Sequence, residues 1–166
     1  IAKISDIAYI AMEYLDGGTL VDKLRVGVSV GESISIVVQV ASALEEAHKL
    51  GIIHRDLKPA NVMLRGGRVP VLTDFGIARE LTASQTRITA ENMIVGTPIY
   101  MSPVQVSGGE VDGRSDLYAL GIMFFELLTG QAPYKGDTPI AVCMQHVTAP
   151  LPKLPADLAD LQPVMD

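Results

Sequence analysis

The chain has 166 residues, of which 48% are apolar and 19% charged, and a formal net charge of −6. This composition can bury a core and argues against disorder, while the acidic balance without a basic run argues against a general nucleic-acid binder. The single cysteine, Cys143, excludes an intrachain disulfide and is compatible with a reducing compartment. The longest apolar stretch, 117–128, is too short to span a bilayer, and no signal peptide is recognisable.

The first predicted element is a buried strand over residues 7–14, which the turn residues 15–18 interrupt. A short helix is predicted over 19–24. Ser29 and Glu32 then have the spacing of a capping box, in which each side chain satisfies a backbone donor at the start of a helix.

The helix after Ser29 is predicted to be long, with one apolar face and an end at Gly51. His48 is interpreted as a packed residue of the helix end, in preference to a ligand. The predicted face comprises Ile34, Val37, Val38, Ala41, Leu44 and His48.

Short strands are predicted over 62–64 and 69–72, with the glycine-containing turn 65–68 between them. Such a hairpin would place Asn61 and Asp74 at its two open ends, close enough to share a metal ion.

The helix that starts at 112–116 is apolar almost all round, which is typical of a helix in the middle of a domain. Gly130 closes it, a last helix is predicted near 138–147, and the proline-containing tail carries no readable signal. The apolar residues are Leu117, Leu120, Ile122, Met123, Phe124, Phe125, Leu127 and Leu128.

One polar stretch separates the apolar runs: His54-Arg55-Asp56-Leu57-Lys58-Pro59-Ala60-Asn61, followed by Asp74-Phe75-Gly76. The first run resembles the catalytic loop of protein kinases and the second resembles their metal-binding turn. The run Gly96-Thr97-Pro98-Ile99-Tyr100-Met101-Ser102-Pro103 is close to the version in bacterial eukaryotic-like (Hanks-type) Ser/Thr kinases. The resemblance implies an α+β protein-kinase-like fold, with the hinge and a mostly helical C-terminal lobe.

On this resemblance, residues 1–166 form one partial kinase domain. Residues 7–15 would be the last strand of the N-terminal lobe and the hinge, and 19–147 the C-terminal lobe, with its catalytic loop at 54–61 and its activation segment at 74–104. The glycine-rich loop, the strand lysine and its glutamate partner would precede Ile1. We therefore expect an active parent protein and an inactive isolated fragment.

The resemblance also implies the catalytic roles. Asp56 would accept or orient the proton of the substrate hydroxyl, and Lys58 would stabilise charge on the transferred phosphate. Asn61 and Asp74 would bind Mg²⁺, or Mn²⁺, through hard oxygen ligands. Thr97 would contact Asp56 and Lys58 and help to seat the substrate serine or threonine.

In the same way, an ATP-binding set is implied. Met12 would close the back of the pocket, Asp16 would reach the ribose, and residues 13–15 would offer backbone groups to adenine. Met63 would form the floor, although by sequence alone it is a core methionine. The set comprises Met12, Glu13, Tyr14, Leu15, Asp16, Lys58, Asn61, Met63 and Asp74.

Arg55 precedes the catalytic aspartate, as in kinases whose activation loop is ordered by phosphorylation, because a guanidinium pairs bidentately with phosphate. Thr89 is the first candidate for that phosphorylation and Thr86 the second. The resemblance places His54 and Phe75 in the core behind the site.

Asp116 would support the catalytic-loop backbone from below. Val104 departs from the family pattern, which usually has glutamate there to pair with a later arginine. Either the partner has also changed or the segment is less well anchored; a sequence error is a third possibility.

These features predict a Ser/Thr protein kinase that transfers the γ-phosphate of ATP to protein substrates, at a cytoplasmic site even if the parent is membrane-anchored. The alternative is a pseudokinase, a kinase-like docking module without phosphotransfer, to which Val104 lends weight. An unrelated mixed helix–strand fold is the third hypothesis. The oligomeric state and the identity of the substrate protein are not predicted.

Overall fold

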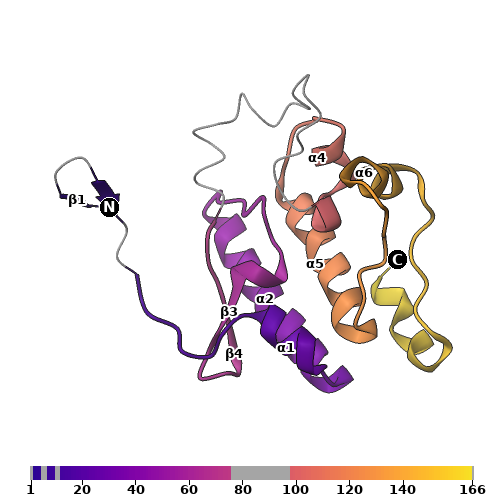
Figure 1. Cartoon of the computed structure of the whole chain (residues 1–166), viewed down its shortest axis with the longest axis horizontal. Coiled ribbons are helices and arrows are strands. Elements are labelled where there is room, and N and C mark those ends of the chain that lie inside the picture. The colour runs from indigo at the N-terminus through magenta and orange to yellow at the C-terminus, as the bar shows by residue number, and fades with distance from the viewer. Residues whose placement is uncertain (1, 5–6, 10–11, 76–97, 166) are drawn as a thin grey trace.

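The structure is a computed structural model that describes residues 2–4, 7–9, 12–75 and 98–165. Most of the described chain is helical, and the strands form two small antiparallel hairpins, as an α+β fold requires (Figure 1). The elements are β1 (Ala2–Ile4), β2 (Ile7–Tyr9), α1 (Leu20–Val26), α2 (Val30–Lys49), η1 (Pro59–Asn61), β3 (Val62–Arg65), β4 (Val69–Leu72), η2 (Pro98–Tyr100), α4 (Pro103–Val106), α5 (Gly113–Thr129), α6 (Pro139–Thr148) and η3 (Ala156–Val164).

The N-terminal strand is shorter than predicted. β2 ends at Tyr9, and the described residues 12–16 are not strand. β2 pairs with β1, with Ala2 opposite Tyr9, and this hairpin lies apart from the helices in Figure 1.

The segment before α1 is attached to β3. Gly17 donates its N–H to the carbonyl of Leu64 at 3.0 Å, and Leu64 donates its own N–H to the carbonyl of Gly18 at 2.9 Å. A Cβ on Gly17 would lie 2.2 Å from the Leu64 oxygen, so only glycine permits this approach. The Asp22 carboxylate then caps α1 by accepting the N–H and the hydroxyl of Thr19.

The start of α2 differs from the predicted capping box. Ser29 does accept the N–H of Glu32, at 3.3 Å, but the Glu32 carboxylate pairs with Lys23 of α1. An ion pair between two helices thus replaces the reciprocal cap. Gly51 follows the helix with φ of +74°, so its predicted role in ending α2 is confirmed.

The predicted apolar face of α2 is wrong at Ile34 and Val38, whereas Val37 packs against the core as expected. Ile34 and Val38 are 38% and 57% exposed, while Leu44 is buried as expected. The N-terminal half of α2 carries apolar residues on more than one face, so spacing alone could not choose between them; packing against α5 does. The residues of α2 that are buried are Ser33, Ile36, Val40, Leu44 and Ala47.

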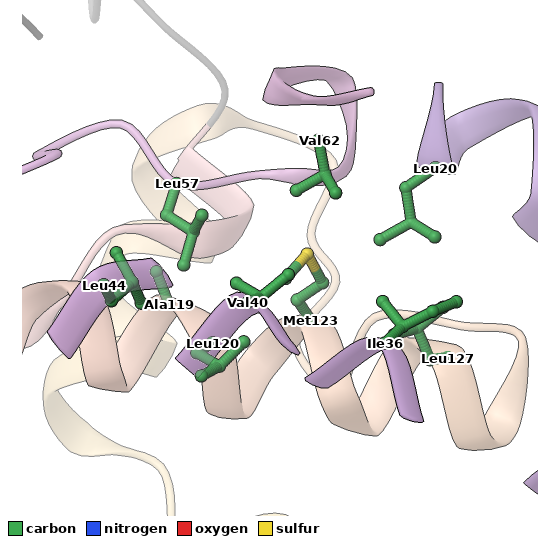
Figure 2. Close-up of a cluster of buried hydrophobic side chains, with 10 residues drawn as sticks. All are labelled: Leu20, Ile36, Val40, Leu44, Leu57, Val62, Ala119, Leu120, Met123 and Leu127. Carbon is green, nitrogen blue, oxygen red and sulfur yellow. The ribbon is translucent and has the colours of Figure 1, made fainter. Parts of the chain in front are cut away.

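The main core lies between α2 and α5 and is closed from above by α1, residues 54–61 and β3 (Figure 2). Leu57 points toward Leu44, and Val62 points toward Met123. These two residues flank Lys58–Asn61, so both ends of that polar run are held by the hydrophobic core. The cluster comprises Leu20, Ile36, Val40, Leu44, Leu57, Val62, Ala119, Leu120, Met123 and Leu127.

α5 begins at the predicted place, with the Asp112 carboxylate accepting the N–H of Arg114, and ends at Gly130 in the left-handed conformation. The helix is not buried on every side, because the apolar side chain of Leu117 is 54% exposed. The predicted hairpin and the last helix are confirmed as β3–β4 and α6. The 3-10 helix η3 in the tail was not predicted.

A smaller cluster joins α5 to α6. His146 of α6 is 5% exposed, and its Nδ1 lies 2.8 Å from the hydroxyl of Tyr118. The ring of Tyr134 packs edge-on against the same imidazole. No helix in the described part of the chain combines the length and apolar character that a membrane span needs.

Candidate active site

The site is built on His54, whose side chain is fully buried. Its Nε2 lies 3.0 Å from the carbonyl of Thr73, and its Nδ1 lies 3.4 Å from the N–H of Asp56. A carbonyl only accepts and a backbone N–H only donates, so this geometry fits Nε2 as the donor to Thr73 and Nδ1 as the acceptor from Asp56. His54 therefore joins residues 54–56 to the segment before Asp74. Phe75 packs against its ring at 4.8 Å between ring centroids, with the two planes tilted by 37°, and both residues lie behind the site as expected.

The carboxylate of Asp116, 1% exposed, supports the loop from α5. It accepts the backbone N–H groups of His54 at 2.9 Å and Arg55 at 2.8 Å. The support predicted from the sequence is thus confirmed. His48 of α2 is more than a packed residue, because its Nε2 donates to the same carboxylate at 2.8 Å.

Two of the expected catalytic residues, Asp56 and Lys58, meet the expected metal ligand Asn61 in one cluster. Lys58 Nζ donates to Asp56 Oδ2 at 2.8 Å, and Asn61 Nδ2 donates to the same oxygen at 3.3 Å. Asn61 Nδ2 also donates to the Asp56 backbone carbonyl at 2.8 Å. The side chains of Asp56 and Lys58 are half-buried, so their attraction is less screened than that of a surface pair.

The expected metal ligands Asn61 and Asp74 come from neighbouring backbone segments. Thr73 donates both its N–H, at 3.0 Å, and its hydroxyl, at 3.2 Å, to the carbonyl of Asn61. Asp74 follows directly, with an exposed side chain and φ of +55°, a conformation that non-glycine residues rarely adopt.

The donor chemistry fits a hard cation. The amide nitrogen of Asn61 is engaged by Asp56, and that leaves the amide oxygen as the ligand atom. Mg²⁺ is usually held by one or two protein side chains together with substrate phosphates. Among the described residues no group of three or more His, Cys, Asp or Glu could hold a metal ion, so an all-protein metal cage is not seen there.

The expected ATP-contacting residues of the hinge lie beside the β3–β4 hairpin. Glu13 pairs with Arg65 through two hydrogen bonds of 3.0 and 2.7 Å, and this raises the pKa of Arg65. Asp16 accepts the N–H of Gly66 at 3.1 Å. Met12, Glu13 and Asp16 are exposed, and Leu15 is buried. Met63 is half-buried, and its backbone forms an isolated antiparallel β-bridge with that of Thr19, three residues after Asp16.

The segment after η2 contains a residue that sequence reasoning missed. The Gln105 side chain of α4 accepts the N–H of Ser102, the residue at the N-terminus of this helix, and donates from Nε2 to the carbonyl of Arg55 at 2.8 Å. The hydroxyl oxygens of Ser102 and of Ser115 on α5 lie 3.0 Å apart, within hydrogen-bond distance. The spacing Ser102-x-x-Gln105 is that of a capping box, so the cap was readable from the sequence but the contact with Arg55 was not.

Val104 is half-buried and lines a surface pocket of about 360 Å³. The arginine that lines the same pocket, Arg114, is paired with Asp112 at 2.7 Å. Next to the site, Tyr100 donates its hydroxyl to Glu126 at 2.6 Å, and burial, with this contact, raises the pKa of Tyr100 far above its usual value. Thr86, Thr89 and Thr97 lie outside the described residues.

Comparison with known proteins gives a consistent result. The family model described as "Protein kinase domain" matches residues 1–158. A probable serine/threonine-protein kinase of Streptomyces coelicolor is 47% identical over 144 residues, which cover 85% of this chain and 21% of the relative. The serine/threonine-protein kinase PknB of Mycolicibacterium smegmatis is 42% identical over 163 residues, which cover 96% of this chain and 26% of the relative. The chain thus spans about a quarter of the length of these relatives.

Proposed function

The chain belongs to the protein kinase domain family, and from that premise we propose that the full-length protein transfers the γ-phosphate of ATP to serine or threonine side chains of protein substrates. The observation that carries the proposal is the cluster of Asp56, Lys58 and Asn61, joined through Thr73 to Asp74. The relatives are named serine/threonine kinases, which supports serine and threonine as the acceptors.

Phosphoryl transfer depends mainly on alignment and on stabilised charge. Asp56 orients the substrate hydroxyl and accepts its proton, while the hydrogen bonds from Asn61 fix the position of the Asp56 carboxylate and carbonyl. Lys58 lies against Asp56, and its ammonium group stabilises the negative charge that builds up on the transferred phosphate in the transition state. Thr97 seats the substrate next to these two residues.

Asn61 and Asp74 hold the divalent metal, Mg²⁺ in the first place and Mn²⁺ as an alternative. Bound with ATP, the metal supplies charge neutralisation on the phosphates. Met12, Glu13, Leu15, Asp16 and Met63 surround the adenosine part. The domain works where ATP is available, which favours a cytoplasmic location.

We propose regulation by phosphorylation at Thr89, or else Thr86, with Arg55 as the partner of the phosphate. The half-buried side chain of Arg55 next to Asp56 supports a link between that phosphate and the catalytic residue.

A docking module without phosphotransfer is the second candidate function. The observation in its favour is Val104, which removes a carboxylate that the family uses to anchor this segment. The catalytic-type residues at 56, 58, 61 and 74 weigh against it, since binding alone does not require them.

The test is transfer of labelled phosphate from Mg²⁺–ATP to a general protein substrate such as casein, by the purified full-length protein. Asp56→Asn should lower kcat by about 10²–10⁴-fold, the usual contribution of a positioned base, with little change in nucleotide affinity. Exposed Asp137 provides the matched control, Asp137→Asn, which should behave as wild type. Near-normal turnover in Asp56→Asn would overturn the role of Asp56. Nucleotide binding without any transfer by wild type would support the docking module.

A further inference from the structure

The Gln105 side chain serves two separate segments of the chain. Its Oε1 accepts the N–H of Ser102 at 2.9 Å and the hydroxyl of Ser102 at 3.2 Å, which caps α4. Its Nε2 donates to the carbonyl oxygen of Arg55 at 2.8 Å, across 50 positions of sequence. One amide therefore joins α4 to the catalytic loop.

Arg55 is a position where the backbone needs such support. Its φ is +65°, in the left-handed region that side-chain-bearing residues seldom occupy. Its N–H is accepted by Asp116 of α5, and its carbonyl accepts from Gln105 of α4. Side chains of two different helices thus hold both backbone polar groups of one strained residue.

The carbonyl of Arg55 and the N–H of Asp56 belong to the same planar peptide group. That N–H donates to His54 Nδ1 at 3.4 Å, which is a long hydrogen bond. The shorter bond from Gln105 on the opposite side of the group therefore sets its orientation, and with it the direction in which the Asp56 side chain leaves the backbone.

We propose that Gln105 is a positioning residue for phosphotransfer, which orients the Arg55–Asp56 peptide group and so couples the position of α4 to the alignment of Asp56. The inference rests on the proposed function. It also identifies an anchor for α4 that does not depend on a carboxylate at position 104.

Two substitutions in the full-length protein distinguish the role of the Gln105 Nε2–H donor from that of its Oε1 acceptor. Gln105→Glu keeps an oxygen for Ser102 and suits the first turn of a helix, but it has no N–H for Arg55. Gln105→Met has a similar shape and lacks both the donor and the acceptor. Gln131→Glu, at an exposed residue, controls for the added charge.

The expected result is a fall in kcat of about 10–100-fold in both Gln105 variants, the usual scale for a displaced catalytic group. The KM for ATP should stay within about two-fold of wild type, because no group that contacts the nucleotide is removed. Wild-type kcat in either Gln105 variant would overturn the inference, since the N–H donor would then be dispensable.

Hydrogen–deuterium exchange on the same proteins gives a readout that does not need activity. Amides of residues 54–58 should exchange several-fold faster in both variants, while those of α2 and α5 keep their protection. Unchanged exchange at 54–58 would overturn the inference. Absence of phosphotransfer by wild type would instead overturn the proposed function, so the two failures are distinguishable.

Discussion

The carboxylate of Asp116 accepts the backbone N–H of Arg55 at 2.8 Å, across 61 positions of sequence. Arg55 has φ of +65°, which costs a residue with a side chain about 1–2 kcal/mol. The buried carboxylate offsets that cost and holds the neighbouring N–H of His54 as well. Because Asp56 comes next in the chain and Asp116 lies on α5, the position of α5 controls the backbone geometry just before Asp56.

Replacing Asp116 should therefore destabilise the protein strongly. Asp116→Ala leaves the N–H groups of His54 and Arg55 and the Nε2 of His48 without their acceptor, at a total cost of about 3–5 kcal/mol. Asp116→Asn keeps one acceptor oxygen and should lose about half as much. Urea unfolding followed by circular dichroism measures both, with Asp137→Asn as a control expected within about 0.5 kcal/mol of wild type. Equal stability of Asp116→Ala and wild type would contradict the supporting role.

Substitutions of Asn61 should separate metal binding from the positioning of Asp56. Asn61→Ala removes both the oxygen ligand and the Nδ2 donor, so it should raise the half-saturating Mg²⁺ concentration by about 10-fold or more and lower kcat. Asn61→Asp keeps an oxygen ligand but loses the donor to the Asp56 carbonyl. It should lower kcat with little change in the Mg²⁺ requirement.

The measurement is phosphotransfer titrated with Mg²⁺ and, separately, with Mn²⁺, after EDTA treatment. An unchanged Mg²⁺ requirement in Asn61→Ala would argue against Asn61 as a ligand.

Thr89, or else Thr86, should carry a phosphate in the active full-length protein. A phosphate near Arg55 can accept two hydrogen bonds from one guanidinium, so the modification should raise activity. Mass spectrometry of active protein, before and after phosphatase treatment, locates the phosphate, and Thr89→Ala tests its effect. Active protein with both threonines unmodified would contradict this regulation.

His146 should make the stability of the protein depend on pH. Burial lowers the pKa of His146, while the nearby backbone carbonyls of Pro98 and Ile99 act in the opposite direction. The unfolded chain therefore takes up this proton more readily, starting near the ordinary pKa of about 6.5. The free energy of unfolding should fall as the pH falls below that value, by at most about 1.4 kcal/mol per pH unit for this one proton, and should level off below the folded-state pKa.

His146→Phe keeps the aromatic packing against Tyr134 and removes the titrating group. Urea unfolding at several pH values between 7.5 and 5 should show a shallower acid loss of stability in this variant. If the free energy of unfolding falls with pH equally in wild type and His146→Phe, the pKa of His146 does not differ between the folded and unfolded states.

The sequence by itself determined the parts that depend on local chemistry. Gly51 and Gly130 end helices because glycine adopts positive φ without strain. Ser29 and Asp112 begin helices because their side chains accept a backbone N–H. The hairpin pattern over 62–72 was enough to predict that Asn61 and Asp74 come from its two open ends.

Only the tertiary structure decided which of several possible contacts each side chain makes. The buried face of α2, the exposure of Leu117 and the pairing of Glu32 with Lys23 all depend on which element lies opposite. His48 has the local pattern of a helix-end residue, yet it binds Asp116, 68 positions away. Gln105 has the local pattern of a cap, yet it binds Arg55, 50 positions away. Partners so distant are brought together by the burial of a shared core, which local spacing does not encode.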